Sequence, residues 1–423
     1  MHKKIRIEQL QMGMYIKEFC GSWMEHPFWR TSFLLEDPKD LADIHASSIR
    51  ELWIDTERGL DVPCGEEAVE ADTVERKVEA ELSQVHAPSP PPKAVSLQEE
   101  MGQATKIYNK SKEAVFSMFQ EARMGRAVDA EKARQMVEDI SSSVMRNPGA
   151  LISLARLKNA DEYTYMHSVA VCALMIALAR QLGLSAEETR EAGVAGLLHD
   201  LGKAVIPNEI LNKPGRLTEA EFAVMKTHPG ESHRMLLDGY KVGEIALDVC
   251  LHHHEKTDGT GYPKGLKAAD ISLFAKMGAV CDVYDAITSN RPYKAGWNPA
   301  ESLRKMAEWA PGHFDDHVFQ AFVKSVGIYP IGSFVRLTSG RMGVVVEQNE
   351  HSLLVPRVKV FFYSKSKAYL PPELVDLALL GGREKIVGRE EPQDWGIPSE
   401  RVNAMWSGLA PEQLGLSTTP ARK

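Results

Sequence analysis

The spacing of hydrophobic positions changes twice along the chain and divides it into three regions. In residues 1–82, short runs such as KIRI, MYIKEF and ELWID alternate with the helix-like EDPKDLADIHASSI, which predicts a small α+β module. Between 101 and 328, apolar residues recur every three or four positions, which predicts a helical domain of seven or more helices. At 329–380, β-branched and aromatic runs such as SFVRLT and MGVVVEQ predict a small β-barrel or sheet of about five strands.

Local signals mark where helices begin and where regions end. Ser185 with Glu188, and Thr218 with Glu221, have the spacing of capping boxes at helix starts. The segment SQVHAPSPPPK cannot continue a helix, so residues 83–100 are predicted to be a proline-rich linker. Residues 381–423 are predicted to be a polar tail. The fold class that follows is a multi-domain, mainly α protein with a β-containing module on each side.

Composition narrows the function classes. Apolar residues make up 43% and charged residues 26% of the 423 residues, as in globular domains. The net charge of −8 argues against binding a nucleic-acid polymer through a broad basic surface. The most apolar segment, Val169 to Ala179, is about half the length of a bilayer span, so we predict a buried helix and no membrane span. Five scattered cysteines and the absence of an apolar leader favour the cytoplasm.

Seven side chains in the helical region can bind divalent metal ions through imidazole nitrogen or carboxylate oxygen. They are His167, His199, Asp200, His228, His253, His254 and Asp282. A lone histidine in a helix is more often a core or surface residue than a ligand. However, His167 and Asp282 lie in apolar helical segments, where an unpaired polar group costs about 1–3 kcal/mol. A metal would remove that cost, so we predict that the seven converge on one cleft.

These residues stand in an ordered series of motifs that resembles the HD-GYP phosphodiesterases, a subset of the HD hydrolase superfamily. The motifs lie between about 160 and 325 and are DEYTYMHS, LLHDLGKAVIPNEILNKPGRLT, MKTHP, HHEKTDGTGYPKGL and CDVYDAITSNRPYK. The resemblance implies a helical HD-type catalytic bundle. A small module similar to residues 1–82 often precedes this bundle in proteobacterial members.

By this resemblance, the seven side chains match the family's metal-ligand positions, with Asp200 bridging two ions. Members with three metals have a glutamate one helical turn before the first histidine, where this chain has Tyr163. Glu162 is one residue further back and would point about 100° away, so we predict two ions. Imidazole and carboxylate ligands suit iron or manganese, while zinc, nickel and cobalt stay open.

The resemblance also implies the residues that meet the substrate. Lys203, Arg291 and Lys294 match positions that contact substrate phosphate, although a solvated surface turn is the alternative for the last two. We name the segment DGTGYPKGL, residues 258–266, the GYP loop. It is either a loop that covers the metal cleft or a lip that also faces substrate and contacts partner proteins such as diguanylate cyclases. Its predicted substrate-binding residues are Gly261, Tyr262 and Pro263.

The expected activity is hydrolysis of cyclic di-GMP to linear pGpG, with further hydrolysis to GMP left open. A hydroxide shared by the two ions would attack phosphorus, with His199, Asp200 and Lys203 as catalytic residues. Glu255 has two open roles, to orient a ligand or to carry a proton. Two other interpretations stay open: a sensor or adaptor that binds cyclic di-GMP or docks a cyclase without turnover, and an HD hydrolase of nucleoside triphosphates or guanosine tetraphosphate. A homodimer through residues 103–146 is a further hypothesis.

Overall fold

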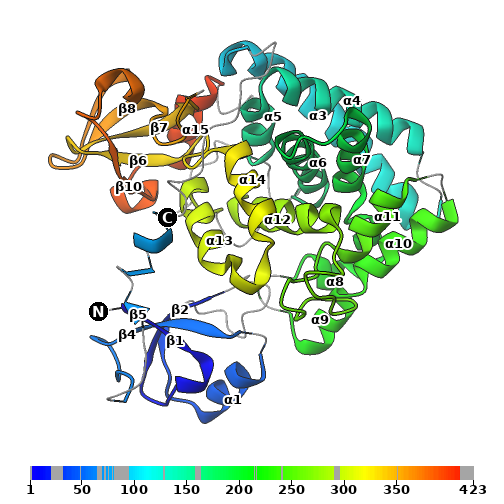
Figure 1. Cartoon of the computed structure of the whole chain (residues 1–423), viewed down its shortest axis with the longest axis horizontal. Coiled ribbons are helices and arrows are strands. Elements are labelled where there is room, and N and C mark those ends of the chain that lie inside the picture. The colour runs from blue at the N-terminus through cyan, green and yellow to red at the C-terminus, as the bar shows by residue number, and fades with distance from the viewer. Residues whose placement is uncertain are drawn as a thin grey trace.

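The structure is a computed structural model, and it describes residues 2–20, 32–47, 49–63, 69–70, 73–74, 76–78, 80, 95–126, 129–157, 163–213, 215, 217–239, 242–289, 296–349 and 351–409. Helices form the body of the molecule, and one five-stranded antiparallel sheet lies toward each end of the chain (Figure 1). The predicted mainly α architecture with two flanking β-containing modules is confirmed.

The N-terminal module is an antiparallel sheet with strand order β3-β2-β4-β1-β5. Its elements are β1 (His2–Arg6), β2 (Tyr15–Phe19), β3 (Phe33–Leu34), α1 (Pro38–Ala46), β4 (Glu51–Asp55) and β5 (Val69–Glu70). Ile5, Ile16, Leu52 and Ile54 are buried in a hydrophobic cluster that is separate from the cluster of the rest of the chain. The module therefore has a core of its own.

The helical region begins with the long helix α3 and ends with α14. Its elements are α3 (Leu97–Arg123), α4 (Ala130–Arg146), α5 (Pro148–Ala155), α6 (Tyr163–Gln181), α7 (Ala186–Leu198), the 3₁₀ turn η4 (Leu201–Val205), α8 (Asn208–Leu211), α9 (Glu219–Met225), α10 (His228–Gly239), α11 (Glu244–His252), α12 (Leu273–Thr288), α13 (Pro299–His313) and α14 (Asp316–Val326). Ser185 and Thr218 cap α7 and α9 through the predicted capping boxes.

Helix α6 is the centre of the helical region. Every residue from Val169 to Ala179 is buried, and the helix packs against α3, α4, α5, α7, α12 and α14. A helix that is apolar on all sides is stable only when it is surrounded in this way. Among the described residues, no helix has both the length and the apolar character needed to cross a bilayer.

The C-terminal module is an antiparallel sheet with strand order β10-β6-β7-β8-β9. Its elements are β6 (Phe334–Leu337), β7 (Arg341–Glu347), β8 (Arg357–Tyr363), β9 (Ala368–Asp376), β10 (Ile386–Arg389) and α15 (Ser399–Ser407). The module extends past the predicted boundary at 380, because β10 pairs with β6 and Trp406 of α15 is buried. Its apolar residues belong to the same cluster as those of the helices, so the two form one core.

Candidate metal and active site

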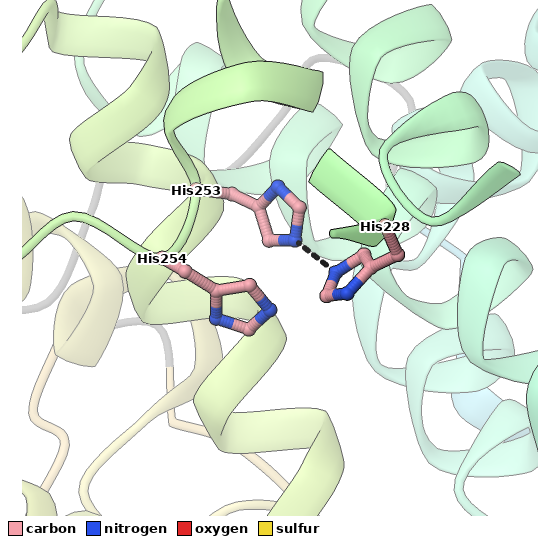
Figure 2. Close-up of side chains that lie close together, drawn as sticks. All are labelled: His228, His253 and His254. Carbon is pink, nitrogen blue, oxygen red and sulfur yellow. Dashed lines mark hydrogen bonds between the residues drawn. The ribbon is translucent and has the colours of Figure 1, made fainter. Parts of the chain in front are cut away.

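The seven predicted metal ligands come from different elements and meet inside the helical region. His167 lies in α6, His199 and Asp200 follow α7, His228 begins α10, His253 and His254 follow α11, and Asp282 lies in α12. Three subsets of these residues offer ligand atoms within 4.8 Å of one another. Figure 2 shows His228, His253 and His254 pointing toward a common space. The predicted convergence is therefore present in the structure.

A tight turn after α7 brings His199 and Asp200 to the cleft together. The helix ends at Leu198, and the next 3₁₀ turn contains Gly202. A side chain at Gly202 would collide with the backbone of α10 at His228 and Ser232, so only glycine lets α10 approach this closely. The Ser232 hydroxyl accepts from the Gly202 N–H at 2.7 Å and donates to the His199 carbonyl at 2.9 Å.

Two of these subsets share no residue, and the first contains His167, His199 and Asp282, while the third joins them through His199, Asp200 and His253. Nε2 of His167 lies 2.9 Å from Oδ1 of Asp282 and 3.2 Å from Nε2 of His199. Oδ2 of Asp200 lies 3.4 Å from His167 Nε2 and 3.3 Å from His199 Nε2. One oxygen of Asp200 therefore faces this group.

The second group contains His228, His253 and His254. Nε2 of His228 and Nε2 of His253 lie 3.4 Å apart. The other oxygen of Asp200, Oδ1, lies 3.2 Å from His228 and 3.8 Å from His253. Asp200 thus presents one oxygen to each group, which is the arrangement of a carboxylate that bridges two cations.

Backbone carbonyls fix the orientation of three of these imidazoles. Nδ1 of His199 donates to the Gly196 carbonyl at 2.8 Å, and Nδ1 of His228 donates to the Met225 carbonyl at 2.7 Å. Nδ1 of His253 donates to the Val249 carbonyl at 3.0 Å. Because a carbonyl can only accept, Nδ1 carries the proton in each ring, and the Nε2 lone pair of the neutral ring points into the cleft.

A carboxylate outside the seven orients His167. Oδ2 of Asp285 lies 2.6 Å from Nδ1 of His167, and both side chains are buried. Asp285 follows Asp282 by three residues in α12, so both carboxylates lie on the same face of that helix. Carboxylates that hold metal-binding histidines in this way raise the basicity of the ring.

The charges of the cleft favour cations. Burial alone would raise the pKa of Asp200, but His199 and Lys203 hold it well below its usual range. Burial opposes ionisation of Asp282 as well, yet the hydrogen bond from His167 keeps its pKa well below normal. Burial, followed by the neighbouring His199 and His228, lowers the pKa of His253 to about 3. The cleft therefore offers ionised carboxylates and a neutral imidazole at neutral pH.

The donor atoms fit divalent metal ions. Oδ1 of Asp200 and Oδ2 of Asp282 are buried and accept no hydrogen bond from the residues that the structure describes. Buried carboxylate oxygens without donors are costly unless a cation compensates them. Burial raises the pKa of the Cys172 and Cys250 thiols, which disfavours thiolate ligands. The site could thus hold metal ions through imidazole and carboxylate ligands.

Metal binding is expected to release a proton from His167. Burial lowers its pKa, but hydrogen bonds to Asp282 and Asp285 outweigh burial and raise it above the ordinary value. Below that raised pKa the metal must displace the proton, so metal affinity should increase with pH until the pKa is passed. Titration calorimetry of metal-free protein with Mn²⁺ at about pH 6.5, in two buffers with different ionisation enthalpies, should show proton release. Identical heats in both buffers would contradict this.

Lys203 lies beside the Asp200 carboxylate. It belongs to η4, and its ammonium group contacts Oδ2 of Asp200. The Lys203 side chain is 18% exposed, whereas the Asp200 side chain is 1% exposed. Lys203 therefore stands at the mouth of the cleft, where a substrate phosphate could reach it.

The GYP loop folds back onto the second histidine group. The Tyr262 ring stacks on the His254 ring at 4.7 Å between centroids, and the Tyr262 N–H donates to the His254 carbonyl at 3.2 Å. A side chain at Gly261 would meet the backbone of Glu255 and Lys256, so glycine is required for this approach. The loop therefore packs against the second histidine group, a contact that its predicted role as a cover of the metal cleft requires.

Buried Glu255 closes the loop. Oε1 accepts from the Lys264 N–H at 2.7 Å, and Oε2 accepts from the Leu266 N–H at 2.9 Å. Both oxygens are thus used by the loop backbone. These contacts show that the carboxylate holds the shape of the loop, while ligand orientation and proton transfer stay predictions for Glu255.

Some predicted residues lie outside the described part of the chain. Arg291 and Lys294 belong to 290–295, and Glu162 belongs to 158–162. Tyr163 begins α6, four residues before His167. Sequence reasoning also missed Asp285 and Ser232. Asp285 could have been found from its i, i+3 spacing to Asp282, and Ser232 from its i, i+4 spacing to His228.

The geometry agrees with comparisons to known proteins. Residues 144–318 match the family described as HD domain, and residues 2–133 match a domain of unknown function. Over 411 residues, or 97% of both chains, the protein is 55% identical to a cyclic di-GMP phosphodiesterase of Pseudomonas aeruginosa. The chain belongs to the HD-GYP phosphodiesterases. It is therefore a phosphoric diester hydrolase.

Other HD-GYP phosphodiesterases match a smaller part of the chain. A cyclic di-GMP phosphodiesterase response regulator of Xanthomonas campestris is 38% identical over 179 residues, which is 41% of this chain and 47% of that one. A 3'3'-cGAMP-specific phosphodiesterase of Vibrio cholerae is 36% identical over 166 residues, which is 39% of this chain and 38% of that one. The family thus includes members named for two different cyclic dinucleotides.

Proposed function

We propose that this protein hydrolyses cyclic di-GMP to linear pGpG, using two divalent metal ions. The observation that carries the proposal is the position of Asp200, whose two oxygens face two separate groups of ligands. The identity over nearly the full length to a relative named for this substrate supports the choice of cyclic di-GMP. Iron or manganese is the proposed metal pair, because the ligands are imidazoles and carboxylates.

The chain's own residues prepare the cleft for a phosphodiester. When bound, a pair of divalent ions supplies Lewis acidity and an acidified water for attack on phosphorus. His199 and Asp200 would bind the ions directly. The hydrogen bonds from Nδ1 of the histidines to backbone carbonyls keep the Nε2 lone pairs pointing into the cleft. Lys203 places its ammonium where negative charge develops on the nonbridging phosphate oxygens, which lowers the barrier electrostatically.

Further substrate contacts are proposed for residues near the mouth of the cleft. Arg291 and Lys294 follow α12 in the sequence and would bind the second phosphate of the dianionic substrate. Gly261, Tyr262 and Pro263 would line one side of the bound dinucleotide. In support, the Tyr262 ring already packs against His254, beside the proposed metals.

Partner binding is a separate proposal. Pro263, Lys264 and Gly265 are exposed at the outer side of the GYP loop, where a diguanylate cyclase or an adaptor could dock. A homodimer through residues 103–146 remains a hypothesis, which the mass measured by light scattering in solution would test.

A product assay tests the proposed reaction. Protein loaded with Mn²⁺ or Fe²⁺ should convert cyclic di-GMP to pGpG, separated by ion-pair chromatography, and the same traces show whether GMP follows. Parallel reactions with 3'3'-cGAMP, a nucleoside triphosphate and guanosine tetraphosphate define the substrate. The double variant His199→Ala, Asp200→Ala should be inactive. Tight binding of cyclic di-GMP without any product, at full metal occupancy, would instead support the sensor hypothesis.

A further inference from the structure

Helix α13 contacts all three parts of the molecule. It lies between the N-terminal sheet and the C-terminal sheet (Figure 1). At its start, the Asn298 side chain donates to the carbonyls of Phe334 and Glu390 in the C-terminal module, at 3.0 and 2.9 Å. At its end, it contacts the segment that leads into the GYP loop. A shift of this helix would therefore change contacts in all three parts of the molecule.

The N-terminal module contacts α13 at one buried carboxylate, that of Glu308. The Trp53 indole N–H donates to Oε1 of Glu308 at 2.7 Å, and the Cys20 thiol donates to the same oxygen at 3.6 Å. The Lys4 ammonium lies 3.8 Å from it. The Glu308 side chain is 1% exposed. A carboxylate buried this deeply is stable only with such partners. These three come from the N-terminal module, and Arg304 of α13 itself lies 3.8 Å from Oε2.

A second contact lies on the same face of the helix. Lys305 pairs with Glu18 of β2 at 2.5 Å, and Lys305 precedes Glu308 by three residues. The N-terminal module has its own core, but Val78 belongs to the main cluster and Cys20 packs against it, so these polar contacts on α13 add to some apolar packing. Polar contacts of this kind fix orientation strongly, since the alternative is a buried charge without partners.

The other end of α13 supports the active-site loop. The helix is kinked at Pro311 and Gly312, where Gly312 has φ +87°. The kink leaves the Gly312 carbonyl free to accept from the Asp258 N–H at 2.9 Å, and the His313 carbonyl accepts from the Thr257 N–H at 3.3 Å. Thr257 and Asp258 stand three and four residues after His254. The support for the loop thus lies about one helical turn beyond Glu308.

We propose that the N-terminal module, which matches a domain of unknown function, is a positioning domain for the catalytic cleft and that Glu308 is its positioning residue. By holding Glu308 and Lys305, the module sets where the end of α13 lies. The end of α13 in turn holds the start of the GYP loop and, through Tyr262, the ring of His254. The kinetic part of this inference rests on the proposed function, whereas the structural part does not.

The test compares Glu308→Ala with Glu301→Gln in the full-length protein loaded with Mn²⁺. Glu301 also lies in α13 and pairs with Arg304, which lies 3.8 Å from Oε2 of Glu308 as well, so this control separates the N-terminal contacts of Glu308 from its contact within the helix. Hydrogen exchange, measured without substrate, should be roughly tenfold faster at the amides of Thr257 and Asp258 in Glu308→Ala. Exchange at these amides should be unchanged in Glu301→Gln.

Kinetics provide the second readout. Glu308→Ala should lower kcat/KM for cyclic di-GMP by roughly tenfold at unchanged metal content, mainly through a higher KM. Glu308→Gln should recover part of this loss, because its amide oxygen can still accept from Trp53. If Glu308→Ala does not fold, Trp53→Phe removes the same donor while keeping an aromatic ring. Unchanged exchange at Thr257 and Asp258 in a folded variant that has lost the Trp53 contact would overturn the proposal. If the parent protein does not hydrolyse cyclic di-GMP, the proposed function fails, and the exchange result still decides the coupling.

Discussion

Replacing Asp200 with asparagine is expected to abolish phosphodiester hydrolysis. The loss should exceed the roughly 10³-fold that removal of a single transition-state donor costs other hydrolases. The physical reason is that Asp200 presents one oxygen to each ligand group, at 3.3 Å from His199 and 3.2 Å from His228. An amide of the same shape offers only one oxygen and places an NH₂ group, which repels a cation, against the other group. Initial rates of cyclic di-GMP linearisation measure the effect, and elemental analysis measures metal per chain.

The matched control for this variant is Asp270→Asn. Asp270 is an exposed carboxylate of the same helical region, so its loss should leave both rate and metal content near those of the parent. Metal content of Asp200→Asn should fall below two ions per chain. If Asp200→Asn keeps two ions and more than a tenth of the activity, the bridging role of Asp200 is wrong.

Replacing Asp285 with asparagine is expected to lower metal affinity and activity by about 10- to 100-fold, the usual cost of losing a carboxylate that orients a metal-binding histidine. Asp285 holds Nδ1 of His167 at 2.6 Å inside the protein. A neutral amide would leave the ring less basic and free to turn. Competition with a chromophoric chelator measures affinity directly and does not depend on the substrate.

Asp248→Asn is a chemically similar control for Asp285→Asn. Asp248 also contacts a histidine Nδ1, that of His252 at 2.7 Å, but His252 is not one of the seven predicted ligands. This variant should change thermal stability more than metal affinity. Equal losses of affinity in both variants would show that Asp285 acts through general packing and not through His167.

Local signals in the sequence predicted most of the architecture. The apolar spacing that predicted a helical region is borne out by α3 to α14, and the all-apolar segment at 169–179 is the buried centre of α6. The capping boxes at Ser185 and Thr218 are present. Such signals are local, because helix periodicity and capping depend on residues within a few positions of one another. The extent of the C-terminal sheet was less predictable, since β10 is defined by its pairing with β6, about fifty residues away.

The sequence by itself determined which side chains can bind metal, because imidazoles and carboxylates in apolar helices need a compensating charge wherever they meet. Only the tertiary structure decided how they meet. It divided the ligands into two groups around Asp200, set Asp285 behind His167, used Glu255 to close the GYP loop and buried Glu308 against the N-terminal module. Roles were predicted from the sequence for two of these four carboxylates, Asp200 and Glu255, and for neither Asp285 nor Glu308. Their roles differ because each depends on partners brought close by packing between elements far apart in the chain, which local spacing does not encode.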